Sequence, residues 1–322
     1  MKRALPSALS ALPAALPAWA ITAAALTVLV IVNGLLQPGF FDGTVLQSNL
    51  TTFLPLVLVA IGQTYVVLAG DIDLSVGAVA ALVNVVTVTV IAATGDGPDA
   101  ILAGLAAGLA VALACGLVNG LLIGVVGLQP MVATFGTAIL FSALALRILP
   151  QAGLPVPDAY WQTYGGAVLG LPTVLLILLL AIGFVALLAR RPFQTWLKAV
   201  GGNRGGAFQS GLDLRRIRLS AYLISALFAG FAALCLTGET ASGDPLLGQS
   251  LGLGSVSAVA LGGTLLSGGV GGAAGSILGA LLLGMIGNVI FFAGLPFEYQ
   301  TLVQGLIVLA ALAGGVLVAR RR

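Results

Sequence analysis

The chain has 322 residues, of which 59% are hydrophobic and only 7% are charged, and its formal net charge is +3. A soluble globular protein of this length needs more polar surface, so the composition excludes that class and predicts an all-α polytopic membrane protein. Histidine is absent, and Cys115 and Cys235 lie far apart inside apolar runs. No metal site, cofactor or disulfide is therefore predicted, and enzymes are disfavoured.

Apolar runs long enough to cross a bilayer recur along nearly the whole sequence. Because a helix of about 20 residues crosses a hydrocarbon core of about 30 Å, about ten transmembrane helices are predicted. They lie at about 19–36, 50–69, 76–93, 100–126, 131–149, 172–189, 219–237, 251–266, 276–294 and 299–318. Together they form a single transmembrane domain, 19–318.

Residues 1–18 begin like a signal peptide, with basic residues ahead of an apolar stretch. Pro6, Pro13 and Pro17 interrupt that stretch, and the first predicted span follows directly. We therefore expect an uncleaved cytoplasmic segment.

The basic residues are clustered between the predicted spans. Twelve of the thirteen lie in three groups: Lys2 and Arg3, the loop 190–218, and the tail 319–322. Lys and Arg flanking membrane spans favour the cytoplasmic side, so both termini and the loop 190–218 are predicted to be cytoplasmic, which agrees with an even number of spans. This distribution gives no support to nucleic-acid binding, which requires charge gathered on one solvated face.

Small residues recur at every fourth position of the predicted span 100–126. They are Gly104, Gly108, Ala112, Gly116, Gly120 and Gly124. This spacing places them on one stripe, where another helix can approach closely. A second glycine-rich run contains Gly262, Gly263, Gly268 and Gly269. Spacing similar to a dinucleotide fingerprint occurs there, but membrane spans flank it, so a tight turn between closely packed helices is favoured.

The stretch 62–77 is unusually polar for its position beside two spans. It contains Gln63, Asp71, Asp73 and Ser75. Carboxylates next to spans are costly to bury, so they indicate either a function or a helix end facing water. Asp73 suits the start of a helix, because a carboxylate there accepts unpaired backbone N–H groups. Three interpretations stay open: a helix cap, contact with a transported solute, and a proton-coupled role for Asp71 or Asp73.

The chain has no P-loop of its own. That motif requires a lysine between glycine and a hydroxyl residue, and neither Lys2 nor Lys198 fits. If ATP drives transport, a separate subunit must grip this chain from the cytoplasm, and the loop 190–218 is the only predicted cytoplasmic loop large enough.

Three blocks resemble the permease subunits of binding-protein-dependent ABC importers, in the branch that serves ribose and other monosaccharides. The stretch 62–77 is similar to the GQT…GGIDLSVG signature. A second block, 201–213, is similar to the segment that forms the coupling helix. A third, 258–269, is similar to AAVVIGGTSLSGG, and Gln304–Ile307 continues it. The resemblance extends from about residue 50 to the C-terminus.

The resemblance implies a permease of the vitamin-B12-importer (type II) fold in the bacterial inner membrane. Its expected partners are a cytoplasmic ATP-binding subunit, a periplasmic or lipid-anchored solute-binding protein and a second permease, identical or not. By the same resemblance, an alternating-access pathway for a monosaccharide is expected, with the ATPase docking on Asn203, Ala207, Ser210, Gly211 and Asp213. Gly205 and Gly206 replace better helix formers there, which favours a short coupling helix. Asp71 stands where the family often has glycine.

Two other classes compete with this one. A secondary transporter would use an ion gradient through Asp71 and Asp73, against which stands the scarcity of other intramembrane ionisable residues. An intramembrane enzyme acting on lipid lacks a nucleophile with a basic partner. Polar residues that are candidates for the solute pathway are Gln63, Asn84, Asn119 and Asn288, although helix-to-helix hydrogen bonding is the commoner role for such residues.

Overall fold

The computed structural model describes residues 19–296, 298–299, 301–303, 305–306 and 309. Its long helices are α1 (Trp19–Leu36), α2 (Gly43–Leu68), α3 (Val76–Thr94), α4 (Pro98–Gly124), α5 (Pro130–Ile148), α7 (Thr173–Ala189), α10 (Leu214–Thr240) and α12 (Ala273–Phe292). The shorter ones are α6 (Asp158–Gly165), α8 (Phe193–Gly202), α9 (Arg204–Gln209) and α11 (Gln249–Leu261). The strands have two residues each: β1 (Leu154–Pro155), β2 (Ala167–Val168), β3 (Leu171–Pro172) and β4 (Ser242–Gly243). β1 pairs antiparallel with β4, and β2 with β3.

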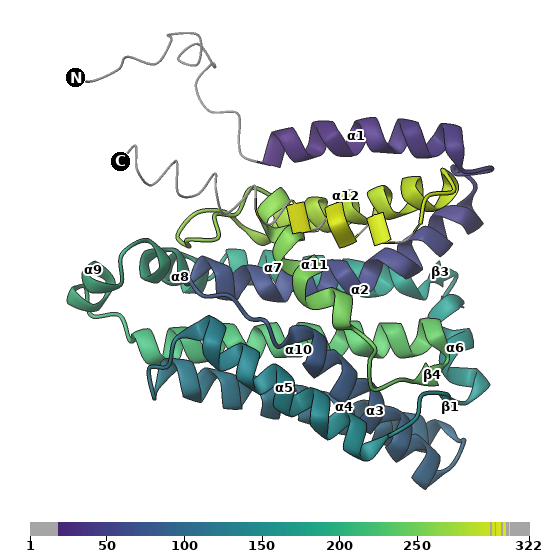
Figure 1. The fold of residues 1–322 in the computed structure, drawn as a ribbon, viewed down its shortest axis with the longest axis horizontal. Helices are drawn as coiled ribbons and strands as arrows, with labels where there is room; N and C mark the ends of the chain where they lie inside the picture. The colour runs from purple at the N-terminus through teal and green to yellow at the C-terminus, as the bar shows by residue number, and fades with distance from the viewer. Residues whose placement is uncertain (1–18, 297, 300, 304, 307–308, 310–322) are drawn as a thin grey trace.

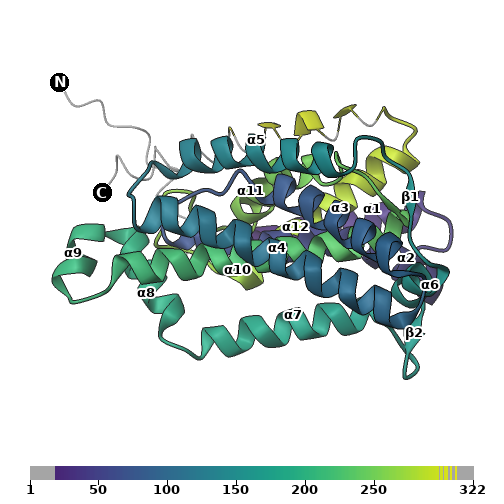
Figure 2. The same ribbon diagram turned by 90° about the horizontal axis from the view of Figure 1, so that it is seen from below.

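The long helices run side by side in alternating directions, and α2 lies at their centre (Figures 1 and 2). α2 is the most deeply buried of the long helices because α7, α10, α11 and α12 all pack against it. α1 lies at the edge of the bundle, against α12. Such an arrangement suits a membrane, since each helix satisfies its own backbone hydrogen bonds.

The stripe of small residues on α4 lets two helices approach closely, as predicted. A Cβ at Gly104 would come within 2.7 Å of the Thr87 carbonyl of α3, and one at Gly116 within 2.9 Å of the Tyr222 carbonyl of α10. α4 therefore packs on α3 with its N-terminal half and on α10 with its C-terminal half.

Most of the predicted spans match helices that are long enough to cross a membrane. Within the described residues, seven helices are long and apolar enough to cross a membrane, and α7 with α8, bent by 72°, makes an eighth candidate. α11 has 13 residues, which rise only about 20 Å and do not cross a core of about 30 Å. The span predicted at 299–318 lies largely outside the described residues.

Two helix starts also differ from the prediction. α2 begins at Gly43, earlier than the predicted residue 50, because its polar first turns lower the hydropathy without ending the helix. α10 begins at Leu214, so the last residues of the predicted loop 190–218 belong to this span. Asp213 caps it by accepting the backbone N–H groups of Arg215 and Arg216, both at 3.1 Å.

The two ends of the bundle differ in charge. One end, on the left of Figure 1, holds the turn 69–75, the loop 190–213 and the turn 262–272, and we call it the basic end. The opposite end holds the turns 37–42 and 95–97, the segment 149–172 and strand β4, which pairs with β1 of that segment. Asp42, Asp96 and Asp158 lie at that opposite end. The charge asymmetry read from the sequence thus separates the two ends in space.

Candidate functional site

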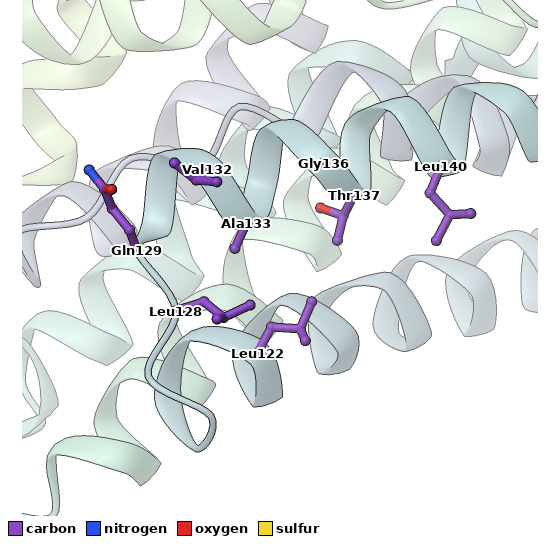
Figure 3. Close-up of a pocket in the computed structure, with 8 residues that line it drawn as sticks. All are labelled: Leu122, Leu128, Gln129, Val132, Ala133, Gly136, Thr137 and Leu140. Carbon is purple, nitrogen blue, oxygen red and sulfur yellow. The ribbon is translucent and has the colours of Figure 1, made fainter.

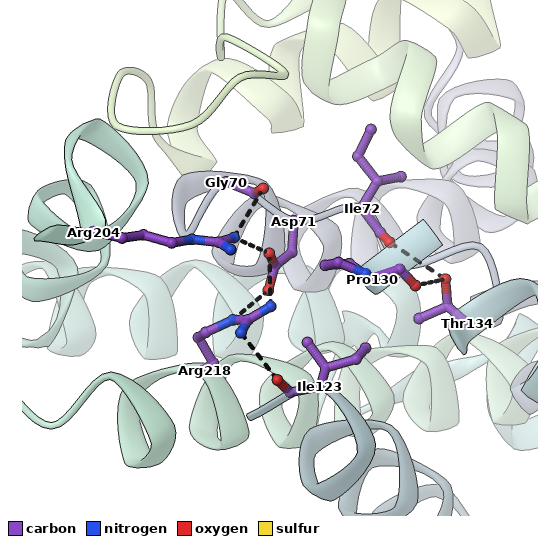
Figure 4. Close-up of polar contacts among 8 residues, drawn as sticks. All are labelled: Gly70, Asp71, Ile72, Ile123, Pro130, Thr134, Arg204 and Arg218. Carbon is purple, nitrogen blue, oxygen red and sulfur yellow. Dashed lines mark hydrogen bonds and ion pairs between the residues drawn. The ribbon is translucent and has the colours of Figure 1, made fainter. Parts of the chain in front are cut away.

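A buried carboxylate, Asp71, joins three segments at the basic end. Its side chain is fully buried and pairs with Arg204 of α9 at 2.5 Å and with Arg218 of α10 at 2.9 Å. Arg218 also donates to the carbonyl of Ile123 at 2.9 Å. Figure 4 shows the two arginines reaching Asp71 from separate elements. The turn after α2 is therefore tied to the loop 190–213, to the start of α10 and to the end of α4.

Asp73 is held by hydroxyl groups instead of cations. One carboxylate oxygen accepts from the backbone N–H of Ser75 at 2.9 Å and from its hydroxyl at 2.6 Å, and the other accepts from Ser225 of α10 at 3.2 Å. Burial raises the pKa of the Asp73 carboxyl, and these hydrogen bonds act in the opposite direction. Asp73 thus fixes the turn that precedes α3, although Ser75 is the residue at the N-cap position.

The polar cluster around Asp73 continues across three helices. In the amide orientation that satisfies both groups, Gln63 of α2 donates to the Asp73 carbonyl at 3.2 Å and accepts from its N–H at 3.1 Å. Asn119 of α4 donates to the Ser75 hydroxyl at 2.8 Å and accepts from Thr137 of α5 at 2.6 Å. Every member is buried, so this cluster holds helices together and does not line an open channel in this conformation.

The sequence predicted ATPase docking in 203–213, and the structure forms a short helix, α9, there. Asn203 caps it by accepting from the Gly206 N–H at 3.0 Å. Ala207 is buried, whereas Ser210 is exposed and Phe208 keeps 69% of its surface. Gly211 adopts φ +81°, which ends the helix in a conformation that glycine tolerates best. Phe208 and Ser210 therefore offer an accessible surface.

Gly70, Gly202, Gly268 and Gly269 form a close contact between three segments beside α8 and α9, which we call the glycine junction. Gly268 has φ +92°, and a Cβ there would lie 2.6 Å from the Cα of Gly70. Gly269 has φ +80°, and a Cβ there would lie 2.9 Å from the Cα of Gly202. The N–H of Gly269 also donates to the Leu68 carbonyl at 3.1 Å. The turn 262–272, the end of α2 and the end of α8 thus meet backbone to backbone.

The other predicted glycines, Gly262 and Gly263, lie where α11 ends. Gly263 has φ +79°, and a Cβ at Gly262 would lie 2.5 Å from the backbone nitrogen of Ser276 in α12. α11 and α12 are therefore closely packed and joined by a tight turn, the arrangement that the sequence favoured.

The remaining polar candidates make helix-to-helix hydrogen bonds. Asn84 of α3 donates to Thr237 of α10 at 2.7 Å and accepts from the Asp244 N–H at 2.7 Å. Asn288 of α12 donates to Asn49 of α2 at 3.0 Å. Neither lines the cleft described next.

A cleft of about 380 Å³ separates the C-terminal end of α4 from the N-terminal half of α5. Figure 3 shows Leu122 of α4 facing Thr137 and Leu140 of α5 across it. Since Thr137 also bonds to Asn119, the cleft borders the polar cluster around Asp73.

Residues 45–312 match the family model described as branched-chain amino acid transport system, permease component. The chain belongs to this permease family. The permease is 34% identical to the ribose import permease protein RbsC of Bacillus subtilis (strain 168), over 89% of each chain. It is 30% identical to the D-allose transport system permease protein AlsC of Escherichia coli (strain K12), over 89% of this chain and 88% of that one. No solved structure matches it significantly.

Family membership and the apolar helices make this permease a multi-pass protein of the bacterial inner membrane, with a role in transport and not in catalysis. Sequence reasoning missed that Arg204 and Arg218 share Asp71, and that Ser225 and Thr137 complete the second cluster. The sequence did contain one indication that Asp71 is paired with arginines: an acid lies in a turn next to a span, and the loop 190–218 has more arginines than acids. The hydroxyl residues gave no signal, because such residues are common in membrane helices.

Proposed function

We propose that the permease forms the translocation pathway of an ATP-driven importer for a monosaccharide and works by alternating access. A separate cytoplasmic ATPase subunit supplies the power stroke, a periplasmic or lipid-anchored binding protein delivers the solute, and a second permease completes the pore. Both termini and the loop 190–213 face the cytoplasm in this proposal, with a type II permease fold that crosses the membrane ten times. The eighth crossing is made by the segment 244–261, because α11 alone is too short. The single observation that carries it is the physical connection from α9 to the buried turn 69–75.

That connection gives the docking surface a route into the bundle. α9 exposes Phe208 and Ser210 to a partner, and the residue that opens α9, Arg204, ends on buried Asp71. Asp71 is in turn bound to Arg218 at the start of α10. A movement of α9 should therefore displace the turn between α2 and α3 and the start of α10, because close-packed polar contacts move together.

The named relatives support a sugar as the cargo. Ribose and D-allose are monosaccharides, and the match to both proteins covers nearly nine tenths of the permease. The family description names branched-chain amino acids instead. Binding assays with the companion binding protein, using ribose, allose and leucine, distinguish these solutes, and we expect binding of a monosaccharide only.

In the part of the chain that the structure describes, the surroundings of the two acids do not favour the ion-driven alternative. Asp71 is paired with two arginines and Asp73 is held by hydroxyl groups. Proton relays need several ionisable groups placed at successive depths in the bilayer. These two acids instead lie in one turn at one end of the bundle.

Reconstitution with the ATPase subunit tests the docking claim. A substitution at Ala207 would disturb packing, because this residue is buried. Phe208→Asp changes an exposed residue of α9 instead. We expect Phe208→Asp to abolish sugar uptake. The same change should increase the rate at which the ATPase subunit dissociates at least tenfold. The matched control is Leu169→Asp, on an exposed apolar residue at the opposite end, which should keep the ATPase bound. Equal retention of the ATPase by both variants would show that α9 is not the docking surface.

A further inference from the structure

An apolar crevice of about 840 Å³ lies between α4, α6, α7 and α10. Helix α7 packs against α2 and α6, and the crevice separates it from α4 and α10 (Figure 2). Its walls include Leu102 and Leu105 of α4, Leu180 and Ala181 of α7, and Phe231 of α10. Leu102 and Leu180 keep 63% and 74% of their surface exposed. The crevice therefore opens sideways, toward the hydrocarbon of the bilayer.

The depth of the crevice corresponds to one leaflet. On α7 its lining runs from Thr173 at the outer end to Phe184, a rise of about 16 Å at about 1.5 Å per residue. This is half of a hydrocarbon core of about 30 Å. On α10 the lining reaches Leu227, which is the midpoint of that helix. With the basic end in the cytoplasm, as the proposed function requires, the crevice runs from the outer surface to the middle of the membrane.

The lining is polar only at its outer end. The hydroxyl-bearing residues that line it are Tyr160, Thr163, Tyr164 and Thr173. Tyr160, Thr163 and Tyr164 donate to backbone carbonyls of the permease. Below them the walls are aliphatic and aromatic. A ligand with a polar end at the membrane surface and an apolar tail reaching to the midplane matches this gradient.

We propose that this crevice is a binding site for an acyl chain of an outer-leaflet membrane lipid, which completes the packing of α7. Water is disfavoured between apolar walls, and the lipid chain is the apolar molecule present at this depth. The bound chain fills the space between α7 and the pair α4 and α10. Since α7 continues through a 72° bend into α8, whose end contacts the glycine junction, the lipid also supports the segment that leads to α9.

Native mass spectrometry of the purified full-length permease, titrated with phosphatidylcholine, tests the site. We expect one lipid to bind saturably. Ala181→Phe, which fills the crevice from a residue that is 7% exposed, should weaken this binding at least tenfold. The matched control is Ala186→Phe, on an exposed residue of the same helix that does not line the crevice, and it should bind as the wild type does. Leu102→Trp narrows the opposite wall and replaces Ala181→Phe if that variant does not fold.

Competition identifies the part of the lipid that is recognised. Lysophosphatidylcholine, which keeps one acyl chain, should displace the bound lipid, and glycerophosphocholine, which keeps only the headgroup, should not. The proposal is overturned by non-saturable binding, by equal binding in the Ala181 and Ala186 variants, or by displacement with the headgroup alone. It is also overturned if a second copy of the chain, and not a lipid, is lost on Ala181→Phe.

Discussion

Neutralising Asp71 should destabilise the permease at least as much as any single change to its two partners. The Asp71 side chain is fully buried and Arg218 keeps only 11% of its side-chain surface. In Asp71→Asn, the guanidinium of Arg218 retains the Ile123 carbonyl but loses its counter-charge. Removing one partner of a buried ion pair costs about 3–5 kcal/mol, and we expect Asp71→Asn to lower the free energy of unfolding by about 3 kcal/mol.

The two arginines should not contribute equally. Arg204 keeps 46% of its side-chain surface, so water screens its charge, and Arg204→Gln should cost about 1 kcal/mol or less. Arg218→Gln should cost about 3 kcal/mol. The double variant Asp71→Asn with Arg218→Gln should cost clearly less than the sum of the single changes, because the two residues share one interaction.

Reversible unfolding in mixed micelles, followed by tryptophan fluorescence and circular dichroism, measures these differences. Asp213→Asn is the matched control: Asp213 and its partner Arg216 are both well exposed, and asparagine retains the helix cap, so its cost should stay below about 1 kcal/mol. The reasoning is refuted if Asp71→Asn costs no more than Asp213→Asn, or if Arg204→Gln costs as much as Arg218→Gln.

Two further predictions concern the glycine junction and the buried polar cluster. Gly268→Ala should cost at least about 2 kcal/mol, since a non-glycine residue at positive φ costs about 1–2 kcal/mol and its Cβ would meet Gly70; Gly127→Ala, also at positive φ but with open space around it, should cost about 1 kcal/mol. Equal costs in the same unfolding assay would contradict the close approach. Asn119→Ala removes the donor to Ser75 and the nearer acceptor of Thr137, which keeps only the Thr134 carbonyl at 3.2 Å, and should cost about 2 kcal/mol. A cost below about 0.5 kcal/mol would show that water replaces the Asn119 amide.

Much of the fold was predictable, because the length of an apolar run determines whether a helix can cross a membrane and basic residues indicate which loops lie on the same side. Nine of the ten predicted spans coincide with helices, and the arginine-rich loop marks one end of the bundle. The short reach of α11 was not predictable, because its start at Gly248, with φ +87°, depends on packing against α3. Helix α6 and the paired strands in 149–172 carry no long apolar pattern, so hydropathy does not reveal them.

The site was predictable in its residues but not in its contacts. The composition of the stretch 62–77 pointed to Asp71 and Asp73, and the structure gives them different partners, cations for Asp71 and hydroxyl groups for Asp73. Asp71 meets arginines of α9 and α10, which are far away in sequence, whereas Asp73 meets Ser75, two residues away, and Ser225 of α10. A single sequence contains no information on such pairings beyond charge balance.

The sidedness of the loop 190–213 tests the account most directly, because an ATPase can grip α9 only from the cytoplasm. Phe208→Cys, on α9, and Leu169→Cys, at the 98% exposed tip of the β2–β3 hairpin, each place an accessible thiol at one end, and the native Cys115 and Cys235 are buried. A membrane-impermeant maleimide should label Leu169→Cys in intact spheroplasts and Phe208→Cys only in inside-out vesicles. Labelling of Phe208→Cys in intact spheroplasts would contradict the account.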